Sequence, residues 1–251
     1  MWQGGDVHPV LILSALPEEI GALRDAMLGS EPVTVAGHEF WSGTVDGSLV
    51  VAATVGIGKV SATIATTLAI SRWAPRAILF AGVGGSLDEA VRIGDVVVAE
   101  RVVAHDTGTL GPNGLERYQP GHVPFLNPTA RFGYTPPDAL LERARDALAD
   151  IDLAPVLGRT PGLLFGIVAS GDQFVNDERV RRRLHEDLGA LVAEMEGAAV
   201  AQTAERFDVP CIVVRAVSDL AGSGAPIDFA RFVEGVVPNT VSVLRALLAL
   251  L

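Results

Sequence analysis

Short apolar runs alternate with longer helical patterns along most of this chain, and that alternation limits the folds open to it. The runs rich in valine, isoleucine, leucine and alanine are expected to be buried strands, at residues 10–16, 49–54, 77–81, 96–99, 163–169 and 212–217. Helical patterns lie at residues 18–28, 60–73, 139–149, 177–188, 197–207 and from 228 to the end. Strand followed by helix, repeated, is typical of a sheet covered on both faces, so we predict a three-layer α/β/α fold with a mostly parallel sheet.

One pair of segments predicts an antiparallel element within that sheet. Residues 39–45 carry Phe40 and Trp41, and the pair Asp46-Gly47 separates them from the apolar run at 49–54. Asp-Gly between two extended segments is a strong hairpin signal. The central sheet is therefore expected to be mixed.

The 251 residues are predicted to form a single domain, residues 1–251. Apolar residues make up 49% of the chain, which suffices for a sizeable core, and neither an internal repeat nor a linker rich in serine and glycine interrupts it. The longest stretch without periodicity, residues 108–137, is rich in proline and glycine. In a compact α/β domain such a stretch is more often a binding loop or a plain surface loop than a domain boundary.

The charge of the chain argues against two classes of partner. With 19 basic and 30 acidic residues, the net charge is −11, so the mean surface field repels nucleic-acid phosphates and anionic lipids. We therefore expect no nucleic acid and no membrane as partner, and a small molecule or a protein instead.

Cysteine content and the start of the chain indicate a cytoplasmic protein. The single cysteine, Cys211, cannot form an intrachain disulfide, and no cysteine–histidine spacing typical of zinc is present. Residues 1–6 lack the positive charge and the apolar stretch of a signal peptide, and no apolar run reaches the roughly 18 residues that cross a bilayer. All basic residues but one are arginine, and Lys59 is the only candidate for amine chemistry.

Two glycine clusters invite a nucleotide-binding interpretation, and both fail the strict test. The cluster at residues 56–60 has valine where a P-loop needs serine or threonine, and its glycine spacing is too short. The cluster at 82–87 follows a strand but lacks the third glycine of the dinucleotide fingerprint. Each cluster is either a tight turn or a strand end where backbone can approach a ligand closely.

Carboxylates at predicted strand ends are the candidates for chemistry. Glu18 and Glu19 follow Pro17 after the first strand, where the crevice of an α/β sheet lies, although acids also favour the first turn of a helix. Asp219 follows the last strand, where a partly desolvated carboxyl can act as a general acid, although helix capping is the commoner role of aspartate at such a position.

A second acidic pair and a histidine leave their own alternatives open. Glu194 and Glu196 lie at a packed junction, and a buried carboxylate there needs a partner, either a polar ligand such as a sugar diol or an arginine such as Arg215. His105-Asp106 has no third ligand at a telling spacing, which favours a hydrogen-bonded structural histidine over a metal site.

Taken together, these pieces resemble the purine nucleoside phosphorylase superfamily and, within it, the 5'-methylthioadenosine/S-adenosylhomocysteine nucleosidases. The likeness runs from Ile12 to Phe232, with its motifs in family order. Each motif is weak alone, but the ordered set is strong. The motifs are Ser-Ala-Leu-Pro-Glu-Glu at 14–19, Gly-Ile-Gly-Lys-Val at 56–60, Gly-Val-Gly-Gly at 82–85, Ile-Gly-Asp-Val-Val at 93–97, Ser-Gly-Asp-Gln-Phe at 170–174, Val-Ala-Glu-Met-Glu-Gly-Ala at 192–198 and Val-Arg-Ala-Val-Ser-Asp at 214–219.

The resemblance implies a role for each matching residue. Asp219, supported by Ser218, would protonate N7 of a purine while the glycosidic bond breaks. Glu19, with Arg215 nearby, would position and activate the attacking water. The resemblance further implies contacts with ribose from Met195 and Glu196, stacking on the base by Phe174, reading of the adenine edge by the Val175 backbone, and lining of the pocket by Val83 and Gly84.

This assignment implies a homodimeric nucleosidase that releases adenine from 5'-substituted adenosines without a metal or an organic cofactor. An acid at the base and carboxylates around the sugar suit a transition state in which the ribose becomes cationic and the purine anionic. Phosphorylase relatives hold phosphate with an arginine in an early loop, where this chain has Glu18 and Glu19, so water is the expected nucleophile. Many of these nucleosidases have Ser-Ala-Gly-Gly where this chain has Gly-Val-Gly-Gly at 82–85. Gly82 therefore lacks the serine hydroxyl that would lie near the sugar and the water.

Three alternatives remain open at this point. The chain could hydrolyse futalosine or aminofutalosine, it could be a phosphate-dependent purine nucleoside phosphorylase, or it could be a nucleoside-binding protein without turnover. The segment 108–137 matches the family poorly, and in the family this region shapes the pocket for the 5' substituent, partly from a neighbouring subunit.

Overall fold

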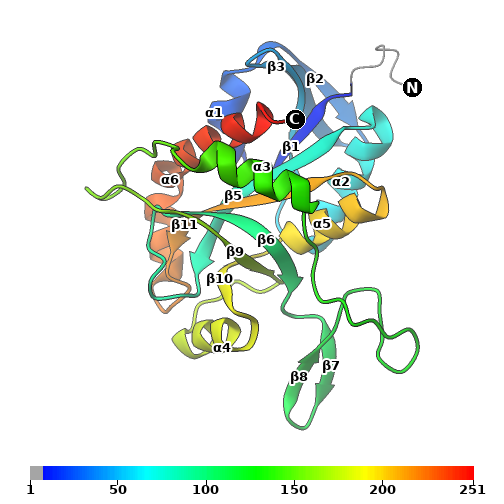
Figure 1. Cartoon of the computed structure of the whole chain (residues 1–251), viewed down its shortest axis with the longest axis vertical. Helices are drawn as coiled ribbons and strands as arrows, with labels where there is room; N and C mark the ends of the chain where they lie inside the picture. Colours follow the sequence, from blue (N-terminus) through cyan, green and yellow to red (C-terminus); the bar gives the residue numbers. More distant parts are fainter. Residues whose placement is uncertain (1–7) are drawn as a thin grey trace.

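A mixed sheet of nine strands forms the centre of the molecule in the computed structural model, which describes residues 8–251 apart from the side chain at position 234 (Figure 1). The start of the chain considered above for a signal peptide lies outside these residues. In spatial order the strands are β10 (Ala190–Glu194), β9 (Leu163–Ser170), β6 (Val96–Ala104), β11 (Cys211–Asp219), β5 (Ala77–Ser86), β1 (Val10–Ser14), β4 (Ser48–Thr54), β3 (His38–Val45) and β2 (Leu28–Val35).

Helices cover both faces of this sheet, which confirms the predicted three-layer α/β/α fold. One face packs against α1 (Pro17–Asp25), α3 (Asp138–Leu148) and α6 (Ala225–Leu248), and the other against α2 (Lys59–Trp73) and α5 (Gly197–Arg206), while α4 (Glu178–Leu188) lies against β9 and β10. Strand β1 shows how one segment serves both layers. Val10 and Ile12 belong to one core and Leu11 and Leu13 to the other, because successive side chains of a strand point to opposite faces.

The sheet is mixed, as the Asp46-Gly47 signal predicted. Strand β3 pairs antiparallel with β4, with Trp41 opposite Ala52, whereas β1 pairs parallel with both β4 and β5. The helix that was expected to reach Leu28 ends at Asp25, and Leu28 is instead the first residue of β2. Pro32 and the mixed polarity of β2 gave no strand pattern, and both are tolerated because β2 lies at the edge of the sheet.

Strand β5 is longer than the sequence indicated, and the extension positions the site. The glycine cluster after Ala81 was open to interpretation as a tight turn, but the strand continues through it to Ser86. It does so because β11 pairs with it in parallel, with Arg215 opposite Gly82 and Val217 opposite Gly84. The carboxyl ends of β1, β5 and β11 therefore reach one edge of the sheet together.

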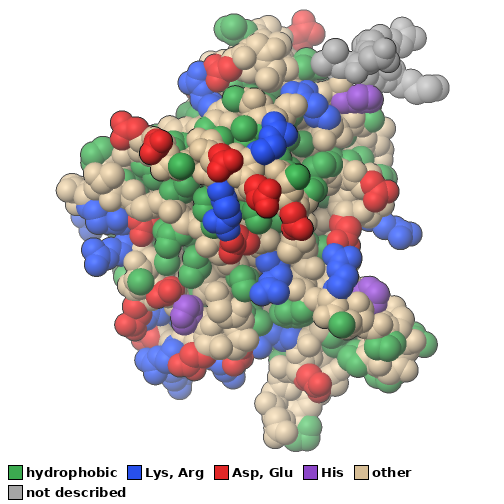
Figure 2. All heavy atoms as spheres, in the orientation of Figure 1, with side chains coloured by type: hydrophobic (Ala, Val, Ile, Leu, Met, Phe, Trp, Pro, Cys, Tyr) green, Lys and Arg blue, Asp and Glu red, His purple; other side chains and the backbone are tan. Residues whose placement is uncertain are grey.

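The proline- and glycine-rich segment 108–137 contains a small hairpin of its own. Strands β7 (Gly108–Gly111) and β8 (Gly114–Arg117) pair antiparallel and project from the body of the molecule at the bottom of Figure 1. Leu110, Phe125 and Leu126 are exposed on this segment, and Figure 2 shows hydrophobic side chains at the surface there. Within residues 8–251, every helix is too short or too polar to cross a bilayer.

Candidate active site

A cavity of about 370 Å³ lies at the edge where β1, β5, β10 and β11 end. Its walls are mostly apolar, with carboxylates reaching it from different parts of the chain. Of the ten residues to which the resemblance gives a role, eight line it, namely Glu19, Val83, Gly84, Phe174, Val175, Met195, Glu196 and Asp219. An apolar pocket with a few convergent polar groups is the usual form of a small-molecule site.

The other two, Arg215 and Ser218, are not among the described residues that line the cavity. The guanidinium of Arg215 is buried, lies 4.2 Å from the ring centroid of Phe80 and binds the carboxylate of Glu194 through Nε and Nη2. The hydroxyl of Ser218 donates to Asp219 Oδ2 at 2.9 Å. Both side chains therefore act on the cavity through a carboxylate that they touch.

Glu19 is held at the bottom of the cavity by two backbone amides. It lies in the first turn of α1, where Leu16 N donates to its Oε2 at 2.8 Å and Val83 N donates to its Oε1 at 3.0 Å. Burial raises the pKa of Glu19, while the charge of Arg215 and these amides work in the opposite direction. Glu18 is exposed and does not line the cavity. Its role is therefore the one open to any acid in the first turn of a helix, which is to stabilise the helix N-terminus.

The structure separates the roles of Glu194 and Glu196, which the sequence left open. Glu194 accepts hydrogen bonds from Arg215, from Ser170 Oγ and from the backbone N of Gly197, whereas Glu196 Oε2 lies 4.0 Å from Arg215 Nη2. Glu196 accepts from Gly58 N at 2.8 Å and lies in the cavity wall. Burial, followed by the negative charge of Glu194, raises the pKa of Glu196 to about 7.

Asp219 occupies the last position of β11 and is almost fully buried. Ala221 N donates to its Oδ1 at 2.9 Å, and Ser218 donates to its Oδ2. Burial raises the pKa of Asp219, against the lowering effect of these two hydrogen bonds. The helix-capping interpretation is wrong, because α6 begins at Ala225 and its N-cap is Gly224.

Aromatic side chains form the mouth of the cavity. Phe174 is 48% exposed and meets Phe229 edge to face, with ring centroids 6.3 Å apart. Phe229 of α6 and Ile57 also line the cavity, and neither is among the predicted site residues. Ile57 lies within the motif at 56–60 but its aliphatic side chain has no chemical signature, and Phe229 lies in none of the motifs, so only their place in the fold identifies them.

The pair His105-Asp106 lies outside the cavity wall and its two members have different surroundings. Asp106 accepts from Lys59 Nζ at 2.6 Å and from Asp172 N at 2.8 Å. His105 is buried, and its Nε2 has no partner among the residues that the structure describes. The hydrogen bond expected for this histidine is therefore not made at Nε2.

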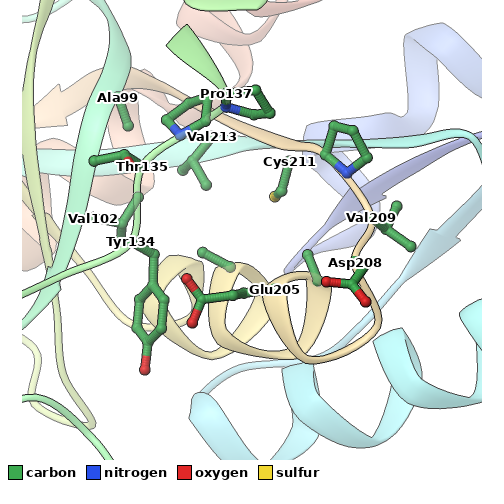
Figure 3. A pocket seen from close by; sticks show the side chains of 14 residues that line it. Ala99, Val102, Tyr134, Thr135, Pro137, Glu205, Asp208, Val209, Cys211 and Val213 are labelled. Atoms are coloured by element: carbon green, nitrogen blue, oxygen red, sulfur yellow. The ribbon is translucent and has the colours of Figure 1, made fainter.

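A second cavity, of about 250 Å³, lies at the other end of β11 (Figure 3). Cys211 lines it together with Tyr134, Glu205 and Asp208, and none of the ten predicted site residues does. Burial raises the pKa of the Cys211 thiol to about 12, so it stays protonated at neutral pH. The carboxylates with raised pKa values, those of Glu19, Glu196 and Asp219, all line the first cavity.

Known proteins match this chain over nearly its whole length. The family model described as "Phosphorylase superfamily" matches residues 9–249. A 5'-methylthioadenosine/S-adenosylhomocysteine nucleosidase from Mycobacterium bovis is 43% identical over 246 residues, which cover 96% of each chain. A nucleosidase of the same name from Neisseria meningitidis, solved in complex with methylthio-immucillin-A, superposes with a TM-score of 0.83 at 28% identity, covering 98% of this chain and 100% of that one.

A differently named structure is equally similar in fold. The futalosine hydrolase of Helicobacter pylori superposes with a TM-score of 0.85 at 28% identity, covering 99% of this chain and 100% of that one. Since the family model spans nearly all described residues and a relative at 43% identity spans both chains almost completely, this chain belongs to the phosphorylase superfamily and, within it, to the 5'-methylthioadenosine/S-adenosylhomocysteine nucleosidases.

Proposed function

We propose that this chain hydrolyses the N-glycosidic bond of 5'-substituted adenosines, such as methylthioadenosine, S-adenosylhomocysteine and 5'-deoxyadenosine, and releases adenine. The observation that carries the proposal is the convergence of Glu19, Glu196 and Asp219 on one largely apolar cavity. The three come from three separate elements, and burial raises the pKa of each. Such groups mark a site built for acid–base work.

At the base, Asp219 is the general acid. Because burial favours its protonated form, it can donate a proton to N7 of the purine while the bond between N9 and C1' breaks. The bonding electrons then leave with a neutral adenine rather than an anion. Phe174 at the mouth offers a face on which the purine can stack, and the backbone of Val175 reads its edge.

At the sugar, Glu19 is the general base and Glu196 holds the ribose. Water attacks C1', its proton passes to Glu19, and the new bond between carbon and oxygen completes hydrolysis to adenine and a 5-substituted ribose. Glu196 accepts hydrogen bonds from the ribose hydroxyls beside Met195, and the negative charge of both carboxylates favours the cationic ring of the transition state. Val83 and Gly84 line the pocket between the two glutamates.

Arg215 acts in this proposal as a positioning residue. It neutralises Glu194 and lies near Glu19 without lining the cavity. No arginine or lysine is among the described residues that line the cavity, whereas phosphate binding relies on such cations. Water is therefore a better nucleophile for this site than phosphate.

The test is release of adenine in the presence and absence of phosphate. Equal rates support a nucleosidase, and a strict requirement for phosphate would make the chain a phosphorylase. A panel of methylthioadenosine, S-adenosylhomocysteine, 5'-deoxyadenosine and aminofutalosine then ranks the substrates. The last compound matters because a similar fold is named futalosine hydrolase. Saturable binding of these compounds with no adenine formed would leave a non-catalytic nucleoside-binding protein.

Exposed apolar side chains beside the cavity support a homodimer. Ile57, just before α2, lines the cavity and is 57% exposed, and Val60 and Ile64, about one turn apart on α2, are 71% and 47% exposed. Apolar side chains that share one helix face are typical of an interface. Sedimentation of the purified protein at twice the chain mass would support the dimer, and sedimentation at the mass of one chain would contradict it. The free Cys211 is consistent with the cytoplasm as the compartment in which the enzyme works.

A further inference from the structure

Lys59 is the only lysine of the chain and lies beside the cavity without lining it. It is the first residue of α2 and directly follows Gly58, whose backbone amide donates to Glu196. Its ammonium is 2.6 Å from Asp106 Oδ1 and 3.8 Å from Asp172 Oδ2. The amine is therefore shared by two carboxylates that come from different segments.

Backbone amides extend this ion pair into a closed network. Lys59 N donates to Asp172 Oδ1 at 2.8 Å, and Asp172 N donates to Asp106 Oδ2 at 2.8 Å. Each of the three residues thus contacts both others. The network, which we call the Lys59 clamp, joins the turn before α2, the turn after β6 and the segment after β9.

Two of the joined segments carry cavity residues. The turn before α2 presents Ile57 to the cavity and Gly58 N to Glu196, and the segment after β9 presents Phe174. Gly58 has a φ of +90°, and a Cβ on it would lie 3.0 Å from Asp172 Oδ1. The positive φ favours glycine here, and the next amide along the chain, Lys59 N, is held by Asp172 Oδ1 at 2.8 Å.

We propose that Lys59 is a positioning residue that holds the Gly58 amide against Glu196 and thereby fixes the carboxylate that accepts from the ribose hydroxyls. This inference rests on the proposed function, since it concerns the same substrate. The charge of Lys59 holds Asp106 and Asp172, and its backbone continues directly from Gly58, which contacts Glu196. Lys59 itself does not line the cavity.

The charge of Lys59 is what keeps the clamp closed. The side chains of Lys59 and Asp106 are only 23% and 13% exposed, so solvent screens their attraction incompletely. Burial raises the pKa of Asp106, but the hydrogen bonds from Lys59 and Asp172 outweigh it and the pKa is lowered. Without the ammonium, the carboxylates of Asp106 and Asp172 would repel each other, and only the two backbone hydrogen bonds would hold the three segments together.

The test compares substrates that differ at the ribose. For Lys59→Met, kcat/KM is measured on methylthioadenosine and on its 2'-deoxy and 3'-deoxy analogues. We expect a loss of about 10- to 100-fold on methylthioadenosine, which is the scale of a misplaced contact group. The loss must be clearly smaller on the analogue that lacks the hydroxyl bound by Glu196, because that contact is already absent. Equal losses on all three substrates, or no loss on any, would overturn the proposal.

Additional variants separate positioning from folding. Lys59→Arg keeps the positive charge and should lose less activity than Lys59→Met. Arg245→Met removes an ion pair with Asp46 that has no contact with the cavity, and it should leave kcat/KM unchanged on every substrate. If Lys59→Met fails to fold, Lys59→Gln replaces it, since the amide can still donate to Asp106 but carries no charge.

A double-mutant cycle gives a second readout that does not depend on the deoxy analogues. If Lys59 acts through Glu196, Lys59→Met adds little further loss in a Glu196→Gln background. Fully additive losses would contradict that coupling. The wild-type arm tests the proposed function separately: absence of adenine release from wild type would refute the nucleosidase itself, whereas normal wild-type turnover with equal losses across substrates would refute only the role of Lys59.

Discussion

Glu19 lies directly against Gly82, so closely that a Cβ at position 82 would be 2.8 Å from Glu19 Oε1. Such a separation is below any normal contact, so the carboxylate occupies the space in which another residue would place its side chain. In return, Oε1 accepts from Val83 N at 3.0 Å. Glycine at position 82 therefore leaves free the space that the Glu19 carboxylate occupies.

Replacing Gly82 by alanine should move the general base. The new methyl group would force the Glu19 carboxylate off Val83 N. A catalytic group displaced by about 1 Å typically costs about 10²-fold in rate, so we expect a loss of that order in kcat. The matched control is Gly21→Ala in α1, where a Cβ meets nothing within 4 Å. This control should keep full activity and gain up to about 1 kcal/mol of stability from its helix propensity. Steady-state kinetics that find Gly82→Ala as active as wild type would show that Glu19 does not need this position.

The buried pair of Arg215 and Glu194 predicts a large stability effect. Arg215→Met leaves Glu194 as an unpaired charge in the core, which typically costs about 3–5 kcal/mol. The double variant Arg215→Met/Glu194→Gln removes that charge and should recover part of the loss. Urea unfolding of the three proteins checks this order. A double variant less stable than Arg215→Met would mean that the lone carboxylate is not the cause.

The contribution of Glu196 to stability without substrate should fall as pH rises toward neutrality. The folded-state pKa of Glu196 is about 7, above its ordinary value of 4.5, so folding favours the protonated form. This contribution is complete below the ordinary value and is lost as pH passes through about 7. Glu19 and Asp219, whose pKa values are also raised, act in the same direction.

Glu196→Gln isolates that contribution. The free energy of unfolding measured between about pH 5 and about pH 8 should decline less in this variant than in wild type, because an amide does not titrate. Identical slopes for the two proteins would contradict the assignment of the raised pKa to Glu196.

The fold could be predicted in large part from local patterns. The apolar runs, the helical patterns and the Asp46-Gly47 turn each have a periodicity or a turn chemistry that acts within about ten residues. The edge strand β2 was missed because Pro32 and its polar neighbours match no strand pattern, and its position rests on pairing with β3. The length of β5 was missed because its glycines are held extended by β11 rather than by their own propensity.

Carboxylates at strand ends could be found in the sequence, but their partners could not. The sequence leaves open whether a ligand or Arg215 partners the acids at 194 and 196, and only the geometry places the arginine on Glu194. The amide of Gly58 lies 138 residues from Glu196 in sequence. Every residue except proline has a backbone N–H, so the residue type does not show which amide will bind a given carboxylate. Phe229 likewise reaches the cavity only through the way α6 packs.

The central claim is that Asp219 protonates the leaving purine, and Asp219→Asn tests it most directly. Asparagine keeps the size of the side chain and can still bind Ser218 and Ala221 N, so ligand affinity measured by calorimetry should change little. The account predicts that adenine release from methylthioadenosine falls by about 10²- to 10⁴-fold, the usual share of general acid catalysis. Release at the wild-type rate, with affinity equally unchanged, would contradict it.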